Sequence, residues 1–193
     1  MKKIILSAIA STCFLTSAAN AVESDFFVKA NLAYSKLNKT NGAKSKNDIA
    51  FGVGLGYNYL DNVRIDLTFD HFVNPKFKSK SKTISGDLNT LLLNAFVDLA
   101  DISIAKIFAG AGIGVGQAQA KISGSADPVE NGKAKKKYGM AYALYLGTGV
   151  EFAPGITAEV TYSYRRMGET KKINGSDVKF EGQQLGAGVR FDL

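Results

Sequence analysis

The sequence contains a single cysteine, Cys13, and a single histidine, His71. Because Cys13 lies in the N-terminal segment that we expect to be removed, the rest of the chain has neither disulfides nor thiolate metal sites. One histidine is a poor basis for a histidine-assisted nucleophile, and the sequence has no ligand cluster suited to zinc. We therefore predict no enzymatic activity, no metal and no cofactor.

Long apolar runs are also missing beyond the N-terminus. Met1-Lys2-Lys3 is positively charged, Ile4–Thr16 is mostly apolar, and Ala19-Asn20-Ala21 is a small-x-small cleavage site. We predict that residues 1–21 are a cleaved signal peptide and that residues 22–193 form one domain. With no apolar stretch long enough for a spanning helix, a membrane role for this domain requires strands.

The chain instead has apolar and polar residues in alternation. From Leu185 to Leu193 every odd position is apolar and every even position is glycine or charged. Seven further segments alternate in this way, at about residues 26–35, 49–59, 63–72, 89–99, 105–117, 138–152 and 157–166. A period of two predicts strands with one apolar and one polar face. Their length of about ten residues is what a tilted strand needs to cross a bilayer.

The connections between these segments alternate in length. Long ones at 36–47, 73–86, 118–137 and 167–179 alternate with short ones at 60–62, 100–102 and 153–156. Short periplasmic turns and longer external loops are typical of outer-membrane barrels, which close because lipid leaves no partner for a sheet edge. We predict an all-β, eight-stranded antiparallel up-and-down transmembrane β-barrel with both termini periplasmic. A soluble lipocalin-like barrel is the alternative, but its apolar face would point inward.

Several segments resemble the opacity-protein-like outer-membrane barrels, which include small surface antigens of obligate intracellular bacteria. The resemblance covers nearly all of the chain after residue 21, and is carried by residues 91–99, 108–114, 147–152, 162–165 and 188–191. It implies an outer-membrane location with loops at the cell surface. Members of this family adhere to host molecules or evade serum, so the resemblance favours an adhesin.

Charged residues of both signs lie on the strand faces opposite the large aliphatic residues. They are Lys29, Arg64, Asp66, Asp70, Asp98, Glu151, Glu159, Arg165, Arg190 and Asp192. Inside a barrel such charges must be paired or hydrated. We favour a polar plug over an ion path, because an eight-stranded interior is just wide enough for side chains to fill. Inward glycines would make room for Phe108 and Tyr145.

Two thirds of the 24 basic residues fall in the four long connections, and all of these are lysines. The candidate contact residues among them are Lys39, Lys44, Lys46, Lys76, Lys78, Lys80, Lys82, Lys133, Lys135, Lys136, Lys137, Lys171 and Lys172. Flexible lysine ammonium groups suit a hydrated surface that attracts polyanions over a distance.

Three partners are compatible with this surface. Host glycosaminoglycans or acidic host proteins would make the protein an adhesin, whereas lipopolysaccharide phosphates would make the lysines a membrane clamp on a purely structural barrel. Nucleic acid is not expected, because the loops have few aromatic residues to stack on bases. We predict a surface adhesin that contacts outer-membrane lipid and is a monomer, with a narrow porin-like channel as the remaining alternative.

Overall fold

The computed structural model describes residues 25–37, 44–45, 48–73, 76–79, 82–123, 132–133, 137–173 and 176–193. The predicted signal peptide lies outside these residues. In the part of the chain that the structure describes, no helix is long and apolar enough to cross a membrane.

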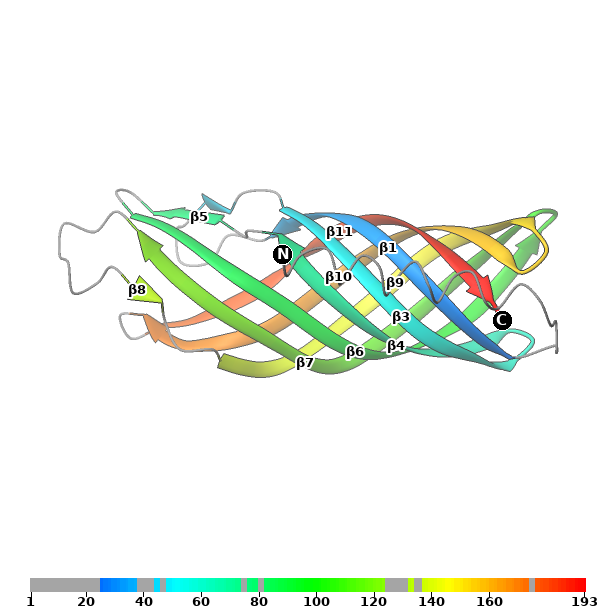
Figure 1. The fold of residues 1–193 in the computed structure, drawn as a ribbon, viewed down its shortest axis with the longest axis horizontal. Helices are drawn as coiled ribbons and strands as arrows, with labels where there is room; N and C mark the ends of the chain where they lie inside the picture. Colours follow the sequence, from blue (N-terminus) through cyan, green and yellow to red (C-terminus); the bar gives the residue numbers. More distant parts are fainter. Residues whose placement is uncertain are drawn as a thin grey trace, which may run out of the picture.

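Eight long strands form a closed antiparallel barrel in which each strand pairs with its neighbours in sequence (Figure 1). They are β1 (Phe26–Leu37), β3 (Asp48–Leu60), β4 (Val63–Val73), β6 (Lys82–Ile102), β7 (Ala105–Ser123), β9 (Lys137–Ala153), β10 (Ile156–Ile173) and β11 (Ser176–Asp192). Pairing of β1 with β11 closes the sheet, so the described barrel wall has no open edge. The prediction of eight strands in up-and-down order is confirmed.

Three short strands extend the sheet at one end of the barrel. They are β2 (Lys44–Ser45), β5 (Lys76–Ser79) and β8 (Gly132–Lys133). The opposite end carries three two-residue turns, at Asp61-Asn62, Ser103-Ile104 and Pro154-Gly155. The start of β1 and the end of β11 lie there as well, since the Leu193 amide donates a 2.9 Å hydrogen bond to the carbonyl of Phe26. We call the two ends the loop end and the turn end.

The predicted positions of several connections were wrong. The second turn is at Ser103-Ile104 rather than at residues 100–102, because a register shift between Asp98 and Ala100 lets β6 continue to Ile102. Much of each predicted long connection is strand: β7 continues to Ser123, and β10 and β11 run to Ile173 and from Ser176. The alternating pattern marks contact with apolar surroundings, whereas backbone pairing continues beyond them.

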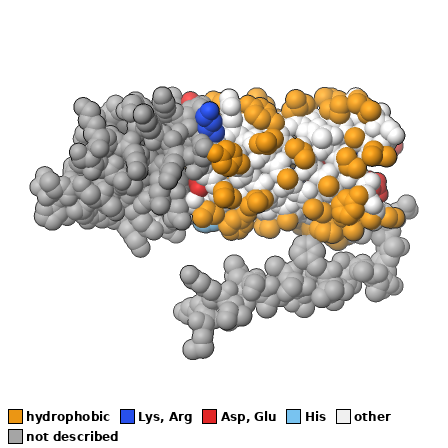
Figure 2. Space-filling view, turned by 90° about the horizontal axis from the view of Figure 1, so that it is seen from above, with side chains coloured by type: hydrophobic (Ala, Val, Ile, Leu, Met, Phe, Trp, Pro, Cys, Tyr) orange, Lys and Arg blue, Asp and Glu red, His pale blue; other side chains and the backbone are white. Residues whose placement is uncertain are grey.

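The outer wall of the barrel is apolar. Leu32, Leu55 and Leu144 are each more than half exposed, and the same face carries many other large apolar side chains (Figure 2). An exposed apolar surface of this extent indicates a non-aqueous environment. The predicted inward and outward faces of the strands are therefore those of the structure.

Inward glycines lie opposite inward aromatic rings on neighbouring strands. Phe108 is in register with Gly147 and Phe96 with Gly110, and a Cβ added at either glycine would collide with the ring. Because glycine has no side chain, each ring lies flat against the wall and the narrow interior is filled.

Candidate functional site: a closed interior and a lysine-rich loop end

The interior is organised around the buried carboxylate of Asp66, which is 2% exposed. Lys29 Nζ lies 2.5 Å from Asp66 Oδ2, while Thr68 Oγ1 and Asn94 Nδ2 each donate a 2.7 Å hydrogen bond to Oδ1. Both oxygens are thus satisfied, as a charge in a low-dielectric site requires. Three strands, β1, β4 and β6, contribute to this cluster.

A second ion pair lies closer to the loop end. Arg165 on β10 pairs with Asp70 on β4 at 2.5 Å, across the barrel interior. The hydroxyl of Tyr145 donates to Asn94 Oδ1 at 2.9 Å, and the Arg165 guanidinium lies 5.3 Å from the Tyr145 ring centroid. Tyr145 therefore joins the two ion pairs into one network.

A third group of charges lies near the turn end. Arg64 pairs with Asp98 at 2.7 Å and with Glu159 at 3.4 Å, and Arg190 lies 3.6 Å from Glu159 and 3.3 Å from Asp192. The Arg64 guanidinium also stacks over Phe108. These two guanidinium groups and three carboxylates form a layer of alternating charge across the barrel, in which each charge has an opposite partner.

Glu151 does not join this network, contrary to the prediction. Its side chain is exposed at the turn end, where Oε1 accepts a 3.1 Å hydrogen bond from the amide of Gly155. A register shift between Ile156 and Thr157 at the β9–β10 turn places Glu151 at the mouth of the barrel rather than inside it.

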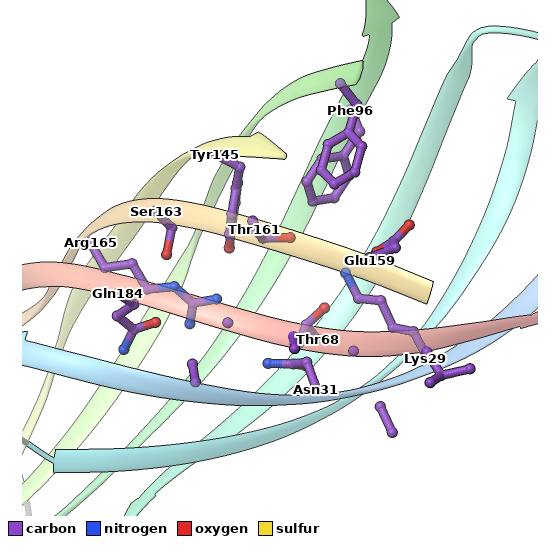
Figure 3. Close-up of a pocket in the computed structure, with 17 residues that line it drawn as sticks. Lys29, Asn31, Thr68, Phe96, Tyr145, Glu159, Thr161, Ser163, Arg165 and Gln184 are labelled. Carbon is purple, nitrogen blue, oxygen red and sulfur yellow. The ribbon is translucent and has the colours of Figure 1, made fainter. Parts of the chain in front are cut away.

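The interior is narrow and is closed towards the loop end. A cavity of about 50 Å³, lined among others by Lys29, Asn31 and Arg165, lies between the ion pairs (Figure 3). Above it an apolar layer fills the lumen, formed by Ala33, Ala50, Phe72, Leu88, Ala118 and Met167. The cavity can hold a few water molecules. At the turn end the interior is wider, with openings of about 590 and 370 Å³ that Arg64 and Arg190 both line.

The candidate contact lysines gather at the loop end. Eight of them lie in strands there, namely Lys44, Lys76, Lys78, Lys82, Lys133, Lys137, Lys171 and Lys172. The other five lie outside the described residues, namely Lys39, Lys46, Lys80, Lys135 and Lys136. The backbone register sets Lys44 opposite Lys78 and Lys121 opposite Lys133.

Some features were not found from the sequence. Tyr145 and Asn94 were missed as network members because neither is charged, although the register of an inward tyrosine could have indicated a partner. A row of hydrogen-bonded polar side chains on the outer wall, which includes His71, was missed as well. Within the described ranges, no group of three or more histidine, cysteine or acidic side chains could hold a metal ion.

A closed barrel with an apolar outer wall and a paired polar interior defines an outer-membrane β-barrel. The chain belongs to the outer membrane protein β-barrel domain family, whose model matches residues 6–191. It therefore lies in the outer membrane with its loops exposed at the cell surface. The family comprises membrane barrels and not enzymes, which agrees with the prediction of no catalytic activity.

Individual relatives agree with this assignment. A Rickettsia conorii protein named as a candidate adhesin is 34% identical over 250 residues, covering all of both chains. The crystal structure of Neisserial surface protein A matches with a TM-score of 0.67 at 19% identity, covering 88% of this chain and 98% of its own. The Yersinia pestis attachment invasion locus protein, in complex with the heparin analogue sucrose octasulfate, matches with a TM-score of 0.53 at 16% identity, covering 88% and 100%.

Proposed function

We propose that this adhesin-like outer-membrane barrel uses its lysine-rich loop end to bind polyanions on host or environmental surfaces, with sulfated glycosaminoglycans as the leading class. The proposal is carried by charge: two thirds of all basic residues are lysines in the four long connections predicted from the sequence, and the described ones among them lie in strands at the loop end. Lysine ammonium groups are compact point charges on flexible stems, which suit irregular anionic polymers better than a single shaped ligand.

The backbone register supports the same conclusion. Lys44 faces Lys78 across one pair of strands, and Lys121 faces Lys133 across another. A sheet that served only to extend the barrel would gain stability from opposite charges at these positions. A bound polyanion removes the repulsion, so binding and local stability are coupled.

The relatives support the general class of function, which is that of an adhesin. The Rickettsia conorii relative is named as a candidate adhesin, and the Yersinia pestis attachment protein was solved with a heparin analogue. A polyanion bound largely through exposed lysines is attracted over about a Debye length, so its affinity falls as salt is added.

The test is chromatography of the refolded protein in detergent on immobilised heparin across a salt gradient. We compare the native chain with a variant in which Lys76, Lys78, Lys80 and Lys82 are changed to Gln. The native protein is expected to bind at low salt, and the Gln variant to elute at clearly lower salt.

A charge-conserving variant with the same four positions changed to Arg is the matched control. It should elute close to the native protein, because the long-range attraction depends on charge. Elution of the Gln variant at the same salt as the native protein would contradict the proposal, provided that circular dichroism shows both to be folded.

A diffusion channel fits less well. The charge layer at Arg64 and Arg190 and the apolar layer at Phe72 and Leu88 both cross the described lumen. An ion would have to break several pairs and then cross an apolar section, which has a high energetic cost. We therefore do not assign a transport function.

A further inference from the structure

Four polar side chains form a continuous hydrogen-bonded row on the outer wall of the barrel. His71 Nδ1 and Asn89 Oδ1 are 2.6 Å apart, Asn89 Nδ2 donates to Gln117 Oε1 at 3.3 Å, and Gln117 Nε2 donates to the Tyr138 hydroxyl at 2.6 Å. The register places each residue directly opposite the next, across β4, β6, β7 and β9. We call these four residues the outer polar row.

The outer polar row lies at an upper boundary of the apolar wall. Two residues nearer the turn end, on the same strand faces, are the exposed apolar residues Phe69, Leu91, Val115 and Met140. In the opposite direction the same strands lead to lysine positions, with Lys82 at the start of β6 and Lys137 at the start of β9. On β6, β7 and β9 the row therefore lies between the hydrocarbon-facing wall and the loop end, whereas on β4 the exposed Val73 follows His71 towards the loop end.

The hydrogen bonds of the row all run in one direction. Because Asn89 Oδ1 can only accept, His71 Nδ1 must carry the proton. Each amide then donates to the next residue, and Tyr138 accepts at the end of the row. Among the described residues, no side chain takes the second N–H of Asn89, the second N–H of Gln117 or the hydroxyl proton of Tyr138.

These donors face outward at a level where water-free hydrocarbon would leave them unsatisfied. An unsatisfied donor in hydrocarbon costs several kcal/mol, so the row must lie in the polar headgroup layer. Tyr138, which is 68% exposed, has the apolar ring and polar tip typical of that layer. The partners available there are water and the phosphate and hydroxyl oxygens of lipid headgroups.

We propose that the outer polar row binds the sugar-phosphate headgroup of an outer-leaflet glycolipid. Asn89 and Gln117 donate from their spare N–H groups and Tyr138 from its hydroxyl, to oxygens of a single headgroup lying along the row. Successive donors polarise one another, which strengthens the terminal hydrogen bonds. This site is separate from polyanion binding at the loop end.

The test uses the refolded full chain in phosphatidylcholine nanodiscs that contain lipid A, a phosphorylated glucosamine disaccharide lipid, as the probe. Native mass spectrometry measures the lipid A retained after release from the disc. The double variant Asn89→Leu/Gln117→Leu removes two donors from a lipid-facing surface that tolerates leucine. We expect its lipid A retention to fall roughly tenfold, the factor for losing one to two hydrogen bonds.

Two further variants distinguish loss of the lipid site from a general loss of folding. Tyr138→Phe removes only the terminal hydroxyl and should also reduce retention. Thr148→Leu makes a matched polar-to-apolar change on β9 within the apolar wall, and should retain lipid A as the native protein does. Inorganic phosphate should not displace the lipid, because the apolar wall holds its acyl chains beside the row.

Retention of lipid A by the Asn89→Leu/Gln117→Leu variant at the native level would overturn the proposal. So would equal loss of lipid A from Thr148→Leu, since the effect would then not belong to the row. Heparin binding by the double variant should be unchanged, so failure of this site and failure of the loop-end proposal are distinguishable.

Discussion

Buried charges that pair with one another stabilise the interior of this barrel. Lys29 is only 15% exposed in its side chain, and its ammonium group lies between Asp66 and the face of Phe96, 5.0 Å from the ring centroid. Removing one member of such a pair leaves the other as an uncompensated charge, and this is more damaging than removing both.

Asp66→Asn should therefore destabilise the barrel by about 3 kcal/mol, because Lys29 loses its carboxylate while Thr68 and Asn94 keep an acceptor. The double variant Lys29→Met/Asp66→Asn should recover much of this loss, since methionine fills the space without a charge. Guanidinium unfolding in detergent, followed by circular dichroism, measures both. Equal destabilisation in the single and double variants would show that the two residues are not coupled.

The sequence predicted which charged residues point inward but not which of them pair. Alternation assigns Lys29 and Asp66 to the inner face, because neighbouring side chains on a strand alternate. Their contact, however, joins β1 to β4 across β3, and depends on the tilt and stagger of a closed barrel.

At the scale of strands, glycine sets how closely β6 and β7 approach. A Cβ added at Gly114 would collide with the backbone carbonyl of Leu91 on the neighbouring strand, and the backbone cannot move aside without breaking the ladder. At Gly149 the nearest atom is instead the methyl group of Thr157, the end of a side chain.

Gly114→Ala should accordingly destabilise the barrel by about 1–3 kcal/mol, the usual range for overpacking. Gly149→Ala is the matched control, and should change stability by less than about 1 kcal/mol because the removed chain entropy offsets a small shift of Thr157. The two variants are compared by heating each in detergent and measuring the fraction of protein that remains folded. A larger loss in Gly149→Ala would contradict this account of the β6–β7 contact.

Strand number was predictable and strand length was not. The apolar alternation of residues 89–99 gave the part of β6 that faces lipid, yet β6 begins at Lys82. In water the outer face needs no apolar residues, so the sequence signal ends while pairing with β5 and β7 continues. The same reasoning explains why predicted loops at residues 167–179 are largely strand.

For the whole molecule, the layers of side chains across the lumen predict that the barrel does not conduct ions. The native protein in planar bilayers should give no discrete single-channel currents, because the described ion pairs and the apolar layer around Phe72 and Leu88 interrupt the path. A larger porin inserted in the same bilayer verifies that conduction is detectable. Stable, reproducible current steps from this protein would contradict this prediction and favour the channel hypothesis.

The strand order has a consequence for how the molecule is assembled. Every long strand pairs with the next one along the chain, except where β1 meets β11. Hairpins between consecutive strands close short loops and have little entropic cost, whereas joining β1 to β11 must bring together residues as distant in sequence as Phe27 and Asp192. The seam between the first and last strands thus joins the residues most distant in sequence along the described wall, and closing it has the largest loop-closure cost.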